Sequence, residues 1–150
     1  MRRTPSSQLS FDFSATPSAA SGRFRPTRAL LNHRACNKVL ERFLYVRRFF
    51  PELDGRMIHV GLTRAASGMA VQGGDELWIN PSHVSYHTMA HELIHLLQEK
   101  GGVPAGERSC DIYAMARHWT LNDTPPYYVR IPYSFLDARG KLRSEVSMTL

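Results

Sequence analysis

The chain has 150 residues, 43% of them hydrophobic, and a formal net charge of +6. This length allows one hydrophobic core, and no apolar run approaches the roughly 20 residues of a membrane helix, so we expect a domain without a membrane partner. Cys36 and Cys110 are too few for a disulfide framework and form no Cys-x-x-Cys pair, which favours the reducing cytoplasm.

The N-terminal residues 1–26 are rich in Ser, Pro, Ala and Arg without sustained periodicity, which predicts a disordered basic arm. Residues 1–50 hold ten Arg or Lys against two acids, a net of +8, whereas residues 51–150 hold nine against eleven, a net of −2. Residues 1–50 are therefore a candidate DNA-facing surface, and the alternative is a basic face that meets only solvent.

One short segment of the arm suggests a partner. Gln8-Leu9-Ser10-Phe11-Asp12-Phe13 resembles the Gln-Leu-Ser type peptides by which bacterial DNA-processing proteins dock to the sliding clamp. The Arg-rich, Ser-rich and acid-poor composition is equally typical of an organelle transit peptide. Both interpretations stay open at this point.

Residues 27–50 follow a helical pattern that predicts a core helix with a basic outer face. The apolar side consists of Leu31, Ala35, Val39, Phe43, Val46 and Phe50. The basic residues on the other sides are Arg28, Arg34, Lys38, Arg42 and Arg47.

A small sheet is expected next. Residues 57–62 alternate and contain β-branched side chains, which is typical of a strand. Residues 69–72 and 76–80 flank the turn Gly73-Gly74-Asp75, which predicts a β-hairpin.

The following helical stretch, from about Pro81 and Ser82 to the stop signal at Gly101 and Gly102, contains the strongest motif. His91 and His95 are four residues apart and share one helix face, where two imidazoles can bind one metal ion. Glu92 projects beside that face, where a carboxylate can deprotonate a metal-bound water. His83 and His87 continue the spacing backwards, but we expect both to be exposed near the helix start.

A second helix is predicted over residues 105–120. Its first turn contains Glu107, which a tight return of the chain can bring back over His91 and His95. Asp111 lies on the same face as Glu107 and can accept the outer N–H of a ligating His. Two His, one Glu and an open fourth position predict a catalytic Zn²⁺ site, and the order of elements predicts an α+β fold.

The pair His91-Glu92-x-x-His95 and Glu107-x-x-x-Asp111 resembles the gluzincins, zinc metallopeptidases of the thermolysin type, and the size is similar to that of minigluzincins. The resemblance covers roughly residues 27–122. It implies a zincin-like fold in which a small mixed sheet packs on the N-terminal helix, the zinc-binding helix and the glutamate helix. It also implies that His91, His95 and Glu107 bind zinc, that Glu92 is the general base and that Asp111 supports a ligand.

The segments 76–81 and 89–96 are also similar to SprT-like proteases, which usually have a third His as ligand. No His lies between His95 and His118 in this chain, so Glu107 is preferred.

The resemblance to zincins further implies that an edge strand, here residues 67–72, binds the substrate as an added antiparallel strand. A donor to the developing oxyanion is expected. The candidates are Tyr113, His118, Tyr127 and Tyr128.

Residues 127–131 alternate weakly like a strand, and Phe135, Leu136 and Asp137 could fill the cleft as an autoinhibitory segment.

The sequence therefore predicts a zinc-dependent metalloendopeptidase domain at residues 27–150, acting on protein or peptide substrates in the cytoplasm. The first alternative is a DNA-associated SprT-like protease or adaptor, recruited through the basic arm and the clamp-binding-like peptide. The second is a hydrolase of small non-peptide esters or amides. The oligomeric state is left open.

Overall fold

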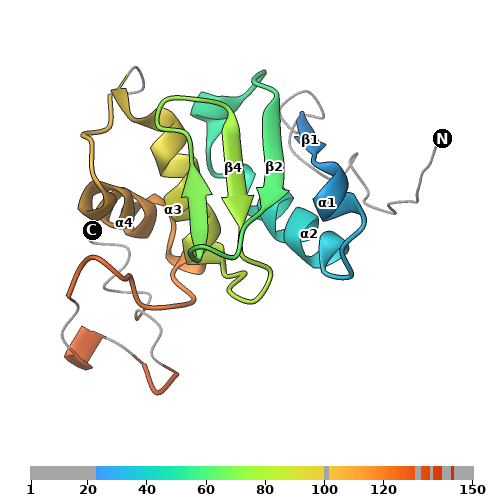
Figure 1. Cartoon of the computed structure of the whole chain (residues 1–150). Coiled ribbons are helices and arrows are strands. Elements are labelled where there is room, and N and C mark those ends of the chain that lie inside the picture. Colours follow the sequence, from blue (N-terminus) through green and yellow to red (C-terminus); the bar gives the residue numbers. More distant parts are fainter. Residues whose placement is uncertain (1–22, 100–101, 131–132, 136, 140–142, 144–150) are drawn as a thin grey trace.

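The computed structural model has a small twisted sheet with helices on one side (Figure 1). It describes residues 23–99, 102–130, 133–135, 137–139 and 143. In Figure 1 the sheet faces the viewer, α2 and α3 lie behind it, and α4 lies beyond α3. None of the helices in these described ranges has the length and apolar character needed to cross a lipid bilayer.

The elements of the described residues, in chain order, are four α-helices, four strands and three 3₁₀ turns. They are β1 (Phe24–Pro26), α1 (Arg28–Leu31), α2 (Cys36–Arg47), η3 (Pro51–Leu53), β2 (Ile58–Leu62), β3 (Gly68–Ala70), β4 (Glu76–Ile79), α3 (Tyr86–Leu97), α4 (Glu107–Arg117), η5 (Trp119–Leu121) and η6 (Tyr133–Phe135).

The sheet is mixed, with strand order β1-β2-β4-β3. Strands β1, β2 and β4 run parallel, while β3 pairs antiparallel with β4. The predicted strand at residues 57–62 and the predicted hairpin are both formed, and the α+β class is confirmed. Strand β1 lies inside the segment expected to be a disordered arm, so the ordered chain begins before residue 27. Residues 1–22, including the clamp-like peptide, lie outside the described residues.

The core fills the space between the sheet and helices α2 and α3. Alternate residues of β2 and β4, Ile58, Val60, Leu77 and Ile79, are fully buried against the helices, as the period of two in a strand requires. Helix α3 is covered by the sheet, by α2 and by α4, so that its polar residues are buried with its apolar ones. Burial of polar side chains without partners is costly, and α3 therefore needs specific partners.

The predicted N-terminal helix is interrupted. Helix α1 ends at Leu31, which is 52% exposed rather than buried, and α2 starts only at Cys36. The break has a local cause. The His33 Nδ1 atom accepts the Ala35 N–H at 2.9 Å, so this N–H does not form the backbone hydrogen bond of a continuous helix. The second half follows the predicted pattern, with Val39, Phe43, Val46 and Phe50 fully buried.

Arg47 is not on the solvated face where the pattern put it. Its side chain is buried and donates to three backbone carbonyls, those of Arg23, Leu53 (2.9 Å) and Arg56 (2.7 Å). Burial lowers the pKa of Arg47 to about 10, which leaves it charged at neutral pH. One guanidinium thus ties the segment before β1 and the loop before β2 to α2.

Replacement of Arg47 by Met should lower the free energy of unfolding by about 3 kcal/mol, because the stem still packs but the carbonyls lose their donors. Urea denaturation measures the change. The matched control is Arg48→Met, at an exposed neighbour, which should change stability by no more than about 0.5 kcal/mol. Equal effects of the two substitutions would mean that the three-carbonyl contact contributes little.

Candidate metal centre

Helix α3 starts later than predicted, and its start is held by two polar residues. Ser85, not Pro81 or Ser82, caps it by accepting the Thr88 N–H at 3.0 Å. The Asp123 carboxylate, beyond α4, accepts the N–H groups of Tyr86 and His87 at 2.9 and 3.0 Å. These contacts fix α3 relative to the segment that follows α4.

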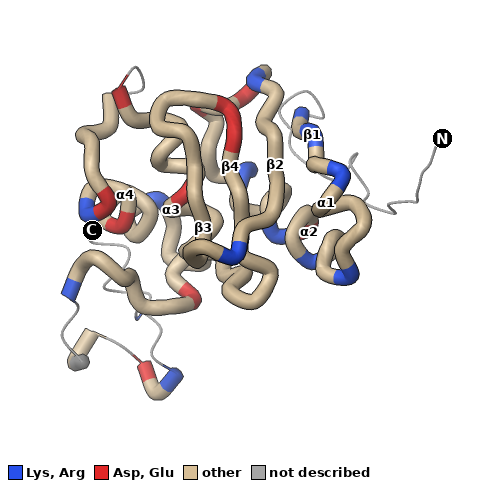
Figure 2. The backbone as a smooth tube through the Cα atoms, in the orientation of Figure 1, with Lys and Arg blue, Asp and Glu red and all other residues tan. Residues whose placement is uncertain are grey.

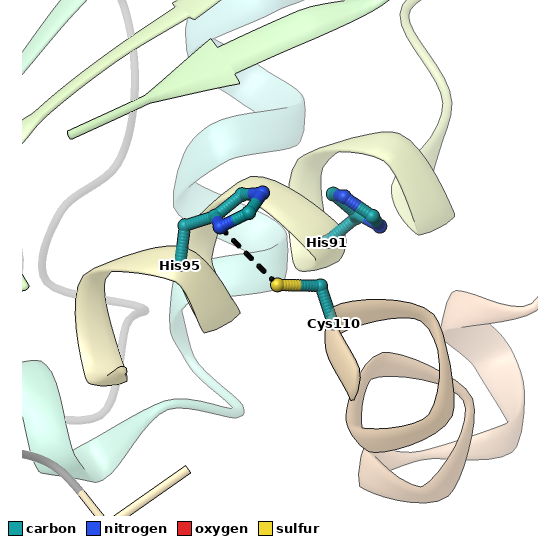
Figure 3. A group of neighbouring side chains, drawn as sticks. All are labelled: His91, His95 and Cys110. Atoms are coloured by element: carbon teal, nitrogen blue, oxygen red, sulfur yellow. Dashed lines mark hydrogen bonds between the residues drawn. The ribbon is translucent and has the colours of Figure 1, made fainter. Parts of the chain in front are cut away.

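His91 and His95 lie one turn apart on the face of α3 that meets α4, with ring centroids 5.1 Å apart (Figure 3). Glu107, the first residue of α4, faces them. Its carboxylate oxygens are 3.0 and 3.1 Å from His95 Nε2, and one is 3.5 Å from His91 Nε2. The turn into α4 uses Gly106 at φ 105°, a conformation that favours glycine. The structure thus brings together the three residues expected to bind metal.

The other nitrogen of each ring has a separate partner. His91 Nδ1 is 2.7 Å from Asp111 Oδ1, and His95 Nδ1 is 2.8 Å from Gln98 Oε1. The Gln98 amide N–H groups donate to the carbonyls of Pro104 and Gly106, which directs its oxygen at His95. A neutral imidazole that donates through Nδ1 keeps its Nε2 lone pair for a metal ion, so these contacts leave the two Nε2 atoms on the Glu107 side as the candidate ligand atoms.

Asp111 is the most connected of these residues. Besides His91, its carboxylate contacts His87 Nε2 at 3.0 Å and accepts the Tyr128 backbone N–H at 2.6 Å. Burial opposes the charge, but these hydrogen bonds outweigh it and hold the pKa of Asp111 well below its usual range. The predicted contact of Asp111 with a site histidine is formed. The prediction that His87 is exposed is wrong, because its exposed fraction is only 4%.

The local field favours positive charge on His91. Burial lowers its pKa, but the hydrogen bond to Asp111 and the carboxylates of Glu92, Asp111 and Glu107 together raise it. A site with three acids around two imidazoles attracts a cation.

Glu92 lies beside the two imidazoles, under the edge of the sheet. It is 4% exposed, and its Oε2 atom is buried without a hydrogen-bond partner among the described residues. Burial raises its pKa from an ordinary 4.5 to about 7, with further raising by Glu107 and Asp111 and partial relief by His91. A carboxyl group that titrates near neutral pH can accept and return a proton.

Gly68 of β3 is packed directly on Glu92. A Cβ atom at this position would lie 2.6 Å from Glu92 Oε1 and 2.8 Å from Cγ, so no side chain fits without moving the carboxyl group. The residues of β3 that bond to β4 are the odd-numbered ones, as in the contacts of Ser67 with Asn80 and Val71 with Glu76. The backbone groups of Gly68 and Ala70 therefore point outward, and no hydrogen bond joins them to another described element.

A cleft of about 750 Å³ opens beside Glu92 and His91. Its walls come from Lys38 of α2, residues 65–68, residues 82–85, helices α3 and α4, and residues 124, 125, 127 and 128. Of the four expected oxyanion donors, Tyr127 and Tyr128 line this cleft, and the Tyr128 ring stacks on His91 at a centroid distance of 5.8 Å. His118 instead stacks on Phe49 at 4.6 Å, away from the cleft.

Cys110 offers a competing donor. Its Sγ atom is 3.3 Å from His95 Nδ1 (Figure 3), and His91, His95 and Cys110 form a group compact enough for a metal ion. The Nδ1 edge of His95 already faces Gln98, however, and burial strongly raises the pKa of the Cys110 thiol. We therefore assign the metal face to the Nε2 edge.

A second compact group consists of His87, His91 and Asp111. Its nitrogen–oxygen distances of 2.7 and 3.0 Å are those of direct hydrogen bonds. Ligand atoms placed about 2.0–2.2 Å from a tetrahedral ion lie roughly 3.4 Å apart. The Glu107 Oε1 atom lies 3.0 Å from His95 Nε2 and 3.5 Å from His91 Nε2, so its spacing is nearer to that of metal ligands.

The C-terminal segment differs from its prediction. In the described part of the expected strand at 127–131, residues 127–129 form bends and residue 130 has no regular structure. Phe135 belongs to the short turn η6, and Asp137 accepts the Arg139 N–H at 2.8 Å. Ile131, Pro132 and Leu136 lie outside the described residues, so autoinhibition stays a prediction.

Sequence reasoning missed three contributors to the centre. His87 was expected to be exposed because it lies near the helix start, but its ring contacts Asp111 of α4 and is buried. Gln98 and Gly68 have no local signal, since their roles depend on contacts with the loop before α4 and with Glu92.

Comparison with known proteins finds no match for this chain among protein-family models, curated proteins or solved structures.

The raised pKa of Glu92 predicts a pH dependence of stability in chelator-treated protein. The neutral carboxyl is favoured in the fold, so its stabilising effect is complete below about pH 4.5 and is lost as the pH rises through about 7. Glu92→Gln should remove this dependence and stabilise the protein at pH 8 by about 3 kcal/mol relative to wild type. Parallel stability profiles for the two proteins across pH 4–8 would contradict the assignment.

Proposed function

We propose that this chain is a zinc-dependent metalloendopeptidase of the zincin-like, gluzincin type. The observation that carries the proposal is the position of the Glu107 carboxylate, 3.0 Å from His95 Nε2 and 3.5 Å from His91 Nε2, with the outer nitrogen of each ring held by its own acceptor. A cation between these three groups would be held by two neutral imidazoles and one carboxylate, and two His with one Glu is a catalytic ligand set for zinc.

His91, His95 and Glu107 would hold the ion. When bound, zinc would lower the pKa of a water molecule and polarise the carbonyl of the substrate. Asp111 and Gln98 orient the two imidazoles, and Asp111 is in turn held by His87 and the Tyr128 backbone. Loss of any of these supports would weaken metal binding rather than abolish it.

Glu92 is suited to the proton transfers. Its carboxyl group, buried beside the two imidazoles, would accept a proton from the attacking water and deliver it to the leaving amine. Tyr127 and Tyr128, from the cleft wall, are the candidates for stabilising the developing oxyanion.

The substrate proposal is an extended peptide. The outward backbone groups of Gly68 and Ala70 can pair with an added strand, which would run past Glu92 because Gly68 packs on that side chain. Such pairing uses main-chain groups common to all peptides, which favours an endopeptidase over a hydrolase of small esters. We propose the cytoplasm as its compartment, and the support for this is that Cys36 and Cys110 form no disulfide.

A DNA-associated role is the second candidate. Several Lys and Arg positions lie along α1 and α2 (Figure 2), and Arg28, Arg34 and Arg48 are exposed there. Binding of duplex DNA that weakens steeply with salt would favour it, and zinc binding without hydrolysis of any unfolded protein would favour an adaptor over a protease.

The main test is Glu92→Gln. The variant should keep stoichiometric zinc but cleave unfolded casein at least about 10²- to 10⁴-fold more slowly, because the amide keeps the shape and cannot act as a base. His91→Ala and His95→Ala should lose zinc as well. The control Glu41→Gln, at an exposed position on α2, should match wild type.

Unchanged casein cleavage by Glu92→Gln would refute the mechanism. Turnover of a small ester by wild type that leaves casein intact would refute the peptidase assignment.

Gly68→Ala tests the packing of the edge strand on the base. The added methyl group must displace the Glu92 carboxyl or shift β3, so hydrolysis should fall roughly tenfold to a hundredfold while zinc content is unchanged. Met69→Ala is the matched control, because the Met69 side chain is 45% exposed on the opposite face of β3. Activity of Gly68→Ala equal to that of Met69→Ala would show that this contact does not position Glu92.

A further inference from the structure

Lys38 has no role in the proposed metal centre, yet it lines the same cleft. Among the described residues, it is the one Lys or Arg that does so. The carboxylates that line the cleft, those of Glu92, Glu107 and Asp111, belong to the metal centre. The cleft thus has acids at the metal centre and an ammonium group elsewhere on its wall.

The position of Lys38 is set by the packing of α2. Arg42, one turn later on the same helix, donates to the Val84 carbonyl at 2.6 Å and lies over the Tyr86 ring at 5.5 Å. Residues four apart share a helix face, so Lys38 lies beside residues 82–85, which form part of the cleft wall.

The Lys38 ammonium group has no partner among the residues that the structure describes. No hydrogen bond or ion pair joins its side chain to another described residue, and Lys38 is exposed. Its ammonium group is therefore available to a group of opposite charge that enters the cleft. A carboxylate there would gain an ion pair, and a cationic side chain would be repelled.

We propose that Lys38 is a specificity-determining residue that selects peptides with a carboxylate near the scissile bond. The inference rests on the proposed peptidase function. The carboxylate is an Asp or Glu side chain of the substrate or its C-terminal carboxylate. Because Lys38 would touch a flanking side chain or terminus and not the reacting atoms, the contact strengthens substrate binding and acts mainly on KM.

The test uses a series of fluorogenic peptides in which Glu, Gln or Lys is moved through each position flanking one cleavable bond. Both ends are blocked in one set, and the C-terminus is free in a second. Wild type, Lys38→Gln and Lys38→Glu are compared with Arg34→Gln, which removes an exposed charge four residues earlier that does not line the cleft. Zinc content and melting temperature are measured for each variant.

Wild type should prefer Glu over Gln at one position by roughly fivefold in kcat/KM, the upper value for an exposed ion pair. Lys38→Gln should abolish the preference, Lys38→Glu should reverse it toward Lys, and Arg34→Gln should retain it. High salt should reduce it. A preference found only in peptides with a free C-terminus would assign the contact to the terminal carboxylate.

Cleavage of the series without a charge preference, or with one that Lys38→Gln leaves unchanged, would overturn the role of Lys38 and leave the peptidase proposal intact. Failure to cleave any peptide or casein would refute the proposed function, and the inference with it. Should Lys38→Glu fold poorly, Lys38→Gln alone decides the result.

Discussion

The buried carboxylate of Asp111 is the contact on which the site depends. It collects hydrogen bonds from His87 and His91 of α3 and from the Tyr128 backbone, while it belongs itself to α4. A buried charge of this kind is stable only when fully hydrogen-bonded. The need to satisfy one carboxylate therefore fixes α3, α4 and residues 124–128 relative to one another, and it orients the first imidazole of the centre.

The sheet supplies the second constraint. Its edge strand β3 packs so closely on α3 that Gly68 touches the Glu92 carboxyl group, which is buried without a partner for one oxygen. Such an arrangement costs stability, and the cost appears as the raised pKa of Glu92. Strained or unsatisfied groups concentrate where a protein acts on another molecule, and here they adjoin the open edge of the sheet.

Local sequence patterns predicted much of the site and part of the sheet. Four-residue spacing found His91 with His95 and Glu107 with Asp111, because both pairs lie on single helix faces. Alternation and a glycine turn found β2 and the hairpin. The break before α2, the short parallel strand β1 and the roles of His87 and Gln98 were missed. The break before α2 comes from a local side-chain contact of His33, and the others depend on contacts between different segments of the chain; periodicity encodes neither.

The central claim is that His91, His95 and Glu107, not Cys110, bind the metal. The optical spectrum of the protein loaded with Co²⁺, measured for wild type, Glu107→Gln and Cys110→Ser, tests it most directly. We predict one bound ion with tetrahedral d–d bands, no thiolate-to-cobalt charge-transfer band, altered bands in Glu107→Gln and an unchanged spectrum in Cys110→Ser. A charge-transfer band that Cys110→Ser abolishes, or no stoichiometric binding, would contradict the claim.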